Sequence, residues 1–200
     1  MTGASRVARV ALAIIDMQND FVLPGAPARV AGAQATVPAI ARLLEKARAG
    51  GWAVFHVIRR HAPDGSDAEI FRRHLYAQGR GICVEGTPGA DIVEGLAPAP
   101  GEAIIVKRRF SAFFGTDFDE RLRRAGIDTL VLAGTQYPNC VRGTAADALY
   151  RDYRVVVVTD ACSAQSGEVA QANIRDMRGM GMACVDFLGL DAALAQDKGE

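Results

Sequence analysis

The sequence predicts an α/β protein of three layers (α/β/α), in which helices cover both faces of an open, Rossmann-like sheet of about six parallel strands. Short apolar runs recur along the 200 residues, and most are followed by a turn and a segment of helical periodicity. The runs are apolar throughout rather than alternating, which is typical of strands buried on both faces in parallel sheets. Because strand and helix alternate through nearly the whole chain, we expect a single domain over residues 1–200.

The apolar runs give the strands, and the amphipathic segments between them give the helices. The predicted strands are 10–15, 52–58, 103–106, 129–134, 154–159 and 183–188. The amphipathic segments are 37–51, 117–127, 140–152 and 168–181. Glycines stand where the helices should end, as left-handed caps do, at Gly50-Gly51, Gly126 and Gly179–Gly181.

One long connection interrupts this alternation, at residues 60–102, where glycine and proline are frequent and strand signals are weak. Within it, Ser66 and Glu69 have the spacing of a capping box, which predicts a helix over 67–76. Long connections inside compact domains are usually functional, so we expect either a lid or a contact between subunits.

The composition favours a small-molecule partner. Lysine plus arginine and aspartate plus glutamate balance at 23 each, and the basic residues are scattered, which argues against nucleic acid or an anionic membrane surface as partner. No apolar run approaches the roughly 20 residues of a membrane span, and the N-terminus shows no secretory cleavage site, so we expect a cytoplasmic protein. The four widely separated cysteines are then expected to be free thiols.

Three chemically active side chains follow different predicted strands. Asp16 follows the first strand, Lys107 the third, and Cys140 lies in the loop after the fourth. In open parallel sheets, ligands bind at the carboxyl ends of the strands. The beginning of a helix can lower the pKa of a thiol, so Cys140 is a candidate nucleophile, with Asp16 to accept its proton and Lys107 to favour the charged forms.

Each of the three residues also has a purely structural interpretation. Asp16 could cap a turn, Lys107 could begin a solvated basic run with its two neighbouring arginines, and Cys140 could be a small buried residue. Their common position at strand ends favours the catalytic interpretation.

The motifs AIIDMQNDF, VKRRFSAFFGT, GTQYPNCVRGTAADAL and VVVVTDACSA, in this order, resemble those of the isochorismatase-like cysteine hydrolases over about residues 9–187. This superfamily includes nicotinamidases, N-carbamoylsarcosine, ureidoacrylate and maleamate amidohydrolases, and isochorismatases. The resemblance implies that Asp16, Lys107 and Cys140 form the catalytic triad, that backbone N–H groups of Gln136 and Cys140 hold the oxyanion, and that the Thr135–Gln136 peptide is cis. It further implies a dimer or tetramer and no cofactor.

A metal site is not expected. Metal-binding nicotinamidases carry an Asp-x-His after the second strand, and Arg59 occupies that Asp position here, two residues before His61. A cation is a poor neighbour for Zn²⁺. This departure argues against a nicotinamidase, leaves His61 and His74 as surface or lid residues, and makes His56 a core residue.

Side chains from the same loops are expected to line the pocket, as in the family. Phe21, Phe110 and Tyr137 are candidates for an apolar wall, and Gln18, with Asn19 beside it, for polar contacts. Arg60 could pair with a substrate carboxylate, although a solvated arginine is the simpler interpretation.

The sequence therefore predicts a cysteine-dependent amidohydrolase that cleaves a C–N bond of a small amide, ureide or carbamoyl compound through a thioester. The alternative within the family is vinyl ether hydrolysis of the isochorismatase type, which needs no cysteine nucleophile. A nucleotide- or flavin-binding domain would need a glycine-rich phosphate loop after the first strand, where the chain has DMQNDF instead. A noncatalytic interaction protein would not need the three residues intact.

Overall fold

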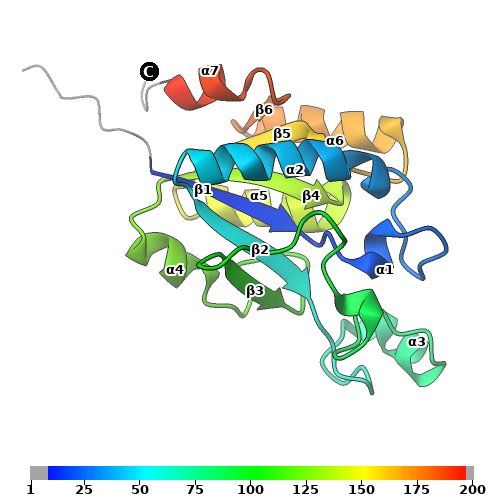
Figure 1. The fold of residues 1–200 in the computed structure, drawn as a ribbon. Helices are drawn as coiled ribbons and strands as arrows, with labels where there is room; N and C mark the ends of the chain where they lie inside the picture. Colours follow the sequence, from blue (N-terminus) through cyan, green and yellow to red (C-terminus); the bar gives the residue numbers. More distant parts are fainter. Residues whose placement is uncertain (1–8, 197–200) are drawn as a thin grey trace, which may run out of the picture.

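In the computed structural model, which describes residues 9–196, a sheet of six parallel strands runs through the middle of the molecule in the order β3-β2-β1-β4-β5-β6 (Figure 1). Strand order reverses between β1 and β4, and ligands of open parallel sheets bind beyond the carboxyl ends of the strands at such a point. The strands are β1 (Val10–Ile15), β2 (Ala53–Arg59), β3 (Ala103–Lys107), β4 (Thr129–Thr135), β5 (Arg154–Ser163) and β6 (Ala183–Val185).

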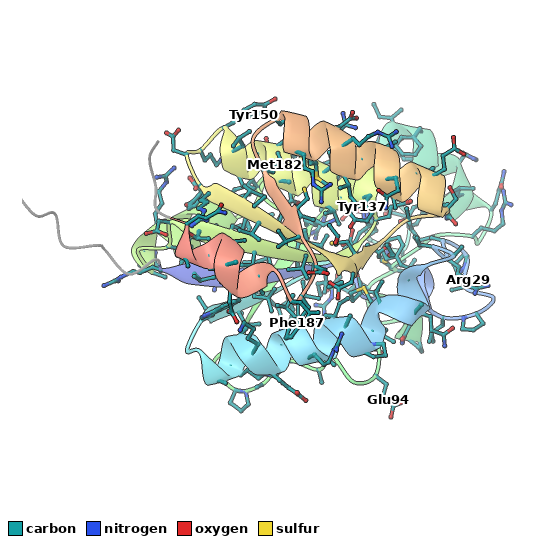
Figure 2. All side chains as sticks on the ribbon, turned by 90° about the horizontal axis from the view of Figure 1, so that it is seen from above. Arg29, Glu94, Tyr137, Tyr150, Met182 and Phe187 are labelled. Carbon is teal, nitrogen blue, oxygen red and sulfur yellow. The ribbon has the colours of Figure 1, made fainter. Side chains whose placement is uncertain are left out.

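Helices cover both faces of the sheet, which confirms the predicted three layers. Figure 2 shows α2 on one side of the sheet and α6 on the other. The α-helices are α1 (Asn19–Val22), α2 (Ala33–Ala49), α3 (Arg73–Ala77), α4 (Phe118–Arg124), α5 (Arg142–Leu149), α6 (Gly167–Gly179) and α7 (Leu190–Ala195). Short 3₁₀ turns lie at η1 (Ile70–Arg72) and η2 (Pro88–Ala90), and a π-helical turn at η3 (Tyr137–Val141).

Two apolar cores, one on each face, hold the layers together. Alternate residues of β1 point to opposite faces, so that Ala13 and Ile15 pack with α4, α5 and α6, whereas Leu12 and Ile14 pack with α2 and α7. All of these β1 side chains are buried. The cores fix the carboxyl ends of the strands at one edge of the sheet, where the loops that follow can converge.

The ends of β1 and β4 approach each other very closely. Gly134, the penultimate residue of β4, has a φ of 118°, and a Cβ atom there would lie 2.1 Å from the carbonyl oxygen of Ile15. Only glycine fits this close approach. The absence of a side chain at Gly134 lets the loops after β1 and β4 begin side by side.

The structure corrects the secondary structure of the long connection. The helix predicted over 67–76 begins only at residue 70, as the 3₁₀ turn η1, and is α-helical only in the five-residue α3. Ser66 caps no helix; its N–H is bound by the Asp64 carboxylate, and Glu69 turns inward to an ion pair with Arg59. Glu69 cannot reach back to Ser66 and stay paired with Arg59. The buried ion pair stabilises the fold more than a helix cap at the surface would.

The predicted strands and helix ends are confirmed with small changes of boundary. The last strand is shorter than predicted, β5 is longer, and Gly51, Gly126 and Gly181 have left-handed φ angles just after helices. All four cysteines are free and buried. Within residues 9–196, no helix combines the length and the hydropathy that a membrane crossing requires.

Candidate active site

Asp16 and Lys107 form a buried ion pair at the carboxyl edge of the sheet. Asp16 follows β1 with a left-handed φ of 51°, and its N–H donates to the carbonyl of Val57 over 2.8 Å. Lys107 ends β3, and its Nζ donates to Asp16 Oδ2 over 2.7 Å and to the Arg109 carbonyl over 3.2 Å. Both side chains are at most 1% exposed. Asp16 Oδ1 has no hydrogen-bond partner among the described residues, which leaves it able to accept a proton.

Cys140 reaches the same place from β4. The Thr135–Gln136 peptide is cis, as the family resemblance implies, and the chain then forms the π-helical turn that contains Cys140 before α5 begins. Pro138 stands in the first positions of this turn, where its missing N–H costs nothing. Cys140 is 6% exposed and lines a pocket together with Asp16.

The pocket is small, with about 250 Å³ of empty space that includes its mouth. It is bounded by loops that follow β1, β2, β3 and β4, together with η1. Its lining residues are Asp16, Phe21, Val30, Arg59, Arg72, Phe110, Thr135, Gln136, Asn139 and Cys140. A pocket of this size takes a small molecule, and its wall combines aromatic and charged side chains.

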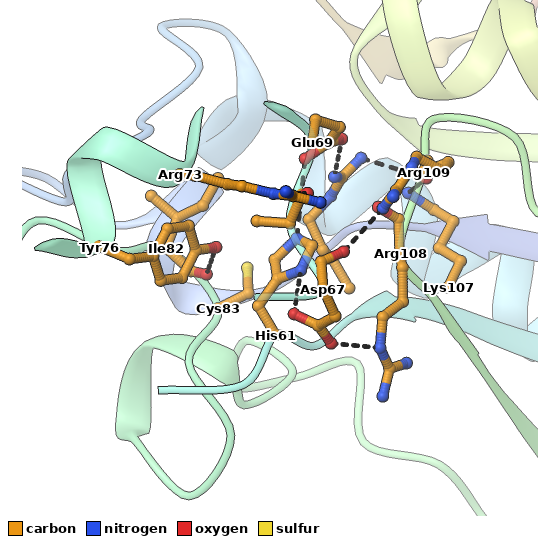
Figure 3. Close-up of polar contacts among 12 residues, drawn as sticks. His61, Asp67, Glu69, Arg73, Tyr76, Ile82, Cys83, Lys107, Arg108 and Arg109 are labelled. Carbon is orange, nitrogen blue, oxygen red and sulfur yellow. Dashed lines mark hydrogen bonds and ion pairs between the residues drawn. The ribbon is translucent and has the colours of Figure 1, made fainter. Parts of the chain in front are cut away.

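A second buried ion pair forms the wall next to Cys140. Arg59, at the end of β2, is fully buried; its Nη1 is paired with Glu69, and its Nη2 donates to the Arg109 carbonyl over 3.2 Å and lies 3.6 Å from Cys140 Sγ. Next to this pair, His61 contacts Asp67, which also binds Arg108 (Figure 3). The Arg59–Glu69 and Arg108–Asp67 ion pairs therefore attach the connection 60–102 to the edge of the sheet.

These charges shift the pKa values of the site. Burial raises the pKa of the Cys140 thiol and the Asp16 charge raises it further, while Lys107 and Arg59 lower it; the net direction is upward. This corrects the expectation that the helix start lowers the pKa, because burial beside a carboxylate outweighs the helix end. Burial by itself would raise the pKa of Glu69, but Arg59 holds it below its ordinary range.

The residues at the position considered for a metal ion do not fit one. Arg59 places a guanidinium there, and its pairing with Glu69 removes a carboxylate that could have served as a ligand. Burial lowers the pKa of His61, and the neighbouring Arg59 charge lowers it further. The His61 ring contacts Asp67 and does not line the pocket. In the described part of the chain, no three His, Cys, Asp or Glu side chains are grouped as metal ligands.

Two of the four predicted pocket residues do not line the pocket. Phe21 and Phe110 do. Tyr137 is 1% exposed, and its hydroxyl donates to the Thr159 carbonyl, so its ring is core. Gln18 is fully buried because its amide binds both the N–H and the C=O of Arg59 and the carbonyl of Ala90.

The remaining predictions about polar residues are mixed. Asn19 donates to the Pro88 carbonyl and so fixes a loop. His61 is buried rather than at the surface, because the connection folds over it, whereas His74 is exposed as expected. His56 is a core residue bound to Glu102, as predicted. Arg60 is half-buried and is not part of the pocket lining.

Two cationic pocket residues, Arg59 and Arg72, are not among the predicted site residues. Arg59 entered the prediction only as the loss of a metal ligand, although it ends a strand just as Lys107 does, and that signal could have identified it. Arg72 lies in the 3₁₀ turn of the long connection, where no periodic pattern marks it. Asn139 and Val30 likewise follow no strand directly.

Comparisons with known proteins identify the family of this chain. The model of the family described as the isochorismatase domain matches residues 10–187. A protein named as a probable inactive nicotinamidase of Arabidopsis thaliana is 44% identical over 90% of this chain and 93% of its own, and maleamate amidohydrolase of Pseudomonas putida is 36% identical over 84% and 78%. The crystal structure of an isochorismatase family protein from Desulfovibrio vulgaris has a TM-score of 0.93 at 65% identity, covering 94% of this chain and 100% of that one. The chain therefore belongs to the isochorismatase family and is an isochorismatase-like hydrolase.

Proposed function

We propose that this protein is a cysteine-dependent amidohydrolase that cleaves a C–N bond of a small amide, ureide or carbamoyl compound through a thioester intermediate. The observation that carries the proposal is the meeting of three groups at one small pocket: the Cys140 thiol, the Asp16 carboxylate with its free Oδ1, and the Lys107 ammonium on Oδ2. The similarity to the maleamate amidohydrolase of Pseudomonas putida supports the same class of reaction.

The first half of the reaction forms the thioester. Asp16 Oδ1 accepts the Cys140 proton as the thiolate attacks the carbonyl carbon, and the oxygen of the tetrahedral intermediate is held by the N–H groups of Gln136 and Cys140. The raised pKa of Cys140 means that the resting thiol is neutral and that its proton leaves at the moment of attack. Protonated Asp16 then gives the proton to the leaving nitrogen, and the C–N bond breaks.

The second half frees the enzyme. Water attacks the thioester carbonyl, Asp16 accepts the proton of the water, and the acid product leaves as the proton passes to the Cys140 sulfur. Lys107 remains charged throughout, because its role is to orient Asp16 and to stabilise negative charge on it. No cofactor enters this sequence.

The test is ammonia release from a panel of amides and ureides: nicotinamide, maleamate, ureidoacrylate, N-carbamoylsarcosine and biuret. Wild type is compared with Cys140→Ser and with Cys184→Ala, a buried cysteine that does not line the pocket. We expect release from at least one compound, abolished by Cys140→Ser and kept by Cys184→Ala. Turnover that survives in Cys140→Ser would exclude the thioester.

A second arm of the same test uses isochorismate with a readout of its product. If isochorismate is turned over and no amide is hydrolysed, the chain belongs instead to the ether-hydrolysing branch. A noncatalytic protein would be favoured if none of the compounds is turned over and iodoacetamide alkylates Cys140 no faster than the other cysteines.

We also propose that the protein acts on its small-molecule substrate as a homo-oligomer, a dimer or tetramer. Ile70 and Phe71 are 83% and 58% exposed on η1, directly before the pocket residue Arg72. Contact with another subunit would remove these apolar side chains from water. Light scattering after gel filtration should give a mass of two or four chains for wild type and a smaller one for Ile70→Asp; a monomeric wild type would contradict the proposal.

A further inference from the structure

Part of the pocket wall is cationic, and the reaction proposed above does not use it. Two arginines, Arg59 and Arg72, line the pocket with Cys140. They come from different elements, since Arg59 ends β2 and Arg72 ends η1. The long connection therefore completes the pocket by adding a charge to it.

Phe110 lies against both guanidinium groups. The Cζ atom of Arg59 is 5.5 Å from the centre of the Phe110 ring, and that of Arg72 is 5.7 Å from it. Phe71 supports Arg72 from another side at 5.0 Å. Cations over ring faces are attracted to them, so these contacts hold Arg72 in place without using its N–H donors.

The donors of the two arginines are incompletely used. Arg59 is fully buried, yet its Nε has no hydrogen-bond partner in the part of the chain that the structure describes. The Nη1 of Arg72 is also buried there without a partner. Buried donors without partners are costly, so a ligand that accepts from them would recover this free energy on binding.

The charges of the site favour one added negative charge. Lys107 is paired with Asp16, and Arg59 is paired with Glu69. The Arg72 guanidinium forms no ion pair or hydrogen bond within residues 9–196, although its charge acts on Glu69. His61 has a lowered pKa and contributes no charge at neutral pH. With Cys140 as a neutral thiol, one cation remains uncompensated at the pocket wall.

We propose that Arg72, together with Arg59, binds a carboxylate on the substrate, so that the natural substrate is a small amide or ureide that also carries one carboxylate. A guanidinium binds a carboxylate with two parallel hydrogen bonds, which gives both affinity and orientation. The carboxylate would turn the carbonyl at the other end of the molecule toward Cys140. That the bound molecule is a substrate rests on the proposed function. That Arg72 binds a carboxylate does not depend on it.

The test compares substrates that differ only in this charge. Maleamate and succinamate each carry one carboxylate and one carboxamide, and their neutral partners, maleamide and succinamide, replace the carboxylate by a second carboxamide. We expect wild type to hydrolyse each monoanion with a kcat/KM at least tenfold above that of its neutral partner. Arg72→Gln should raise KM for the monoanions at least tenfold and leave KM for the diamides within about twofold.

Arg73→Gln is the matched control, since it removes the same charge from the next residue, which is exposed and does not line the pocket. It should behave as wild type. Arg72→Lys keeps the charge without the planar fork, and its KM for the monoanions should fall between those of wild type and Arg72→Gln. Because Arg72 is only partly buried, these variants should fold, and circular dichroism verifies that they do.

A binding measurement separates this inference from the proposed reaction. Calorimetric titration of Cys140→Ser with maleamate and maleamide should show tighter binding of the monoanion, and this preference should be lost in Cys140→Ser/Arg72→Gln.

If no amide is hydrolysed but this Arg72-dependent binding is found, the anion site is supported and the amidohydrolase proposal fails. If amides are hydrolysed with equal kcat/KM whatever their charge, or Arg72→Gln matches Arg73→Gln, the carboxylate site is wrong and the reaction stands. If the titration detects no carboxylate binding, the inference is overturned.

Discussion

The two ends of β3 each carry a cluster of charged side chains, and the clusters differ in how completely their hydrogen-bonding groups are satisfied. Before β3, both oxygens of Glu102 accept hydrogen bonds, from Arg48, His56 and the Ala99 N–H. At the other end, Lys107 binds Asp16, and Arg59 binds Glu69. The Arg48 side chain is 38% exposed, whereas Lys107 and Arg59 are fully buried, and only the second cluster borders the active-site pocket.

The second cluster leaves several polar atoms without partners. Within residues 9–196, Asp16 Oδ1, Arg59 Nε and Arg72 Nη1 have no hydrogen-bond partner, and neither do His61 Nε2 and Glu69 Oε2, which lie 3.9 Å from each other. Among the described residues, no buried side-chain atom of the Glu102 cluster lacks a hydrogen bond. A satisfied buried cluster stabilises the fold, but unpartnered groups beside a pocket indicate that a ligand completes them. The comparison thus assigns stability to one end of β3 and function to the other, and four variants test that division.

Asp16→Asn should have the largest effect. The amide cannot accept the thiol proton, so kcat/KM should fall by about 10³- to 10⁴-fold. The measurement is ammonia release on the best substrate of the panel, with circular dichroism as the control for folding. A loss of less than tenfold would show that another group accepts the proton.

Lys107→Arg keeps the charge but replaces a compact ammonium by a planar fork in a fully buried position. We expect the fold to survive and Asp16 to be displaced, with a loss in kcat of about 10²-fold or more. Steady-state kinetics and thermal unfolding measure the two effects separately. Activity near that of wild type would make Lys107 a bystander.

Glu69→Gln removes the anion that compensates Arg59. The pKa of Glu69 is lowered by Arg59, so the pair stabilises the fold at neutral pH, and an unpaired buried charge should cost about 3 kcal/mol in urea unfolding. Since Asp16, Lys107 and Cys140 are untouched, kcat should fall less than tenfold. A loss in kcat as large as that of Lys107→Arg would place Glu69 in the reaction.

Glu102→Gln should change stability alone, and in a pH-dependent way. Burial opposes the shift, but Arg48, Ala99 and His56 lower the pKa of Glu102 from 4.5 to about 2 in the folded protein. The charged form is therefore favoured by folding, and its contribution, up to about 3 kcal/mol, is complete above pH 4.5 and is lost as the pH falls toward 2.

Urea unfolding between pH 3 and 7 should accordingly show a difference between wild type and Glu102→Gln that shrinks on acidification. Amide hydrolysis at pH 7 should stay within about twofold of wild type, since Glu102 is absent from the pocket lining. A constant difference in stability across this range would show that the Glu102 charge contributes nothing.

The local pattern of apolar residues was sufficient to predict the strands of the sheet. Continuous apolar runs predicted the six strands because a strand buried on both faces needs no polar side. The placement of Asp16, Lys107 and Cys140 together followed from the rule that parallel strands end at one edge of the sheet.

The irregular part depended on contacts that no local pattern contains. Glu69 had the spacing of a helix cap but is paired with Arg59, ten residues away, and Tyr137 followed a strand end but turned into the core. A side chain in a loop can face either way at similar local cost, and burial of a charge or a ring then decides.

The sequence by itself determined the layered fold, the family and the three side chains at the sheet edge, because these depend on hydrophobic periodicity and on strand order along the chain. Only the tertiary structure decided that the thiol has a raised pKa, that one oxygen of Asp16 is free, and that Arg72 joins Arg59 in the pocket wall. The physical reason is that pKa values and hydrogen-bond satisfaction are set by burial and by neighbours distant in sequence, which exist only once the chain has folded.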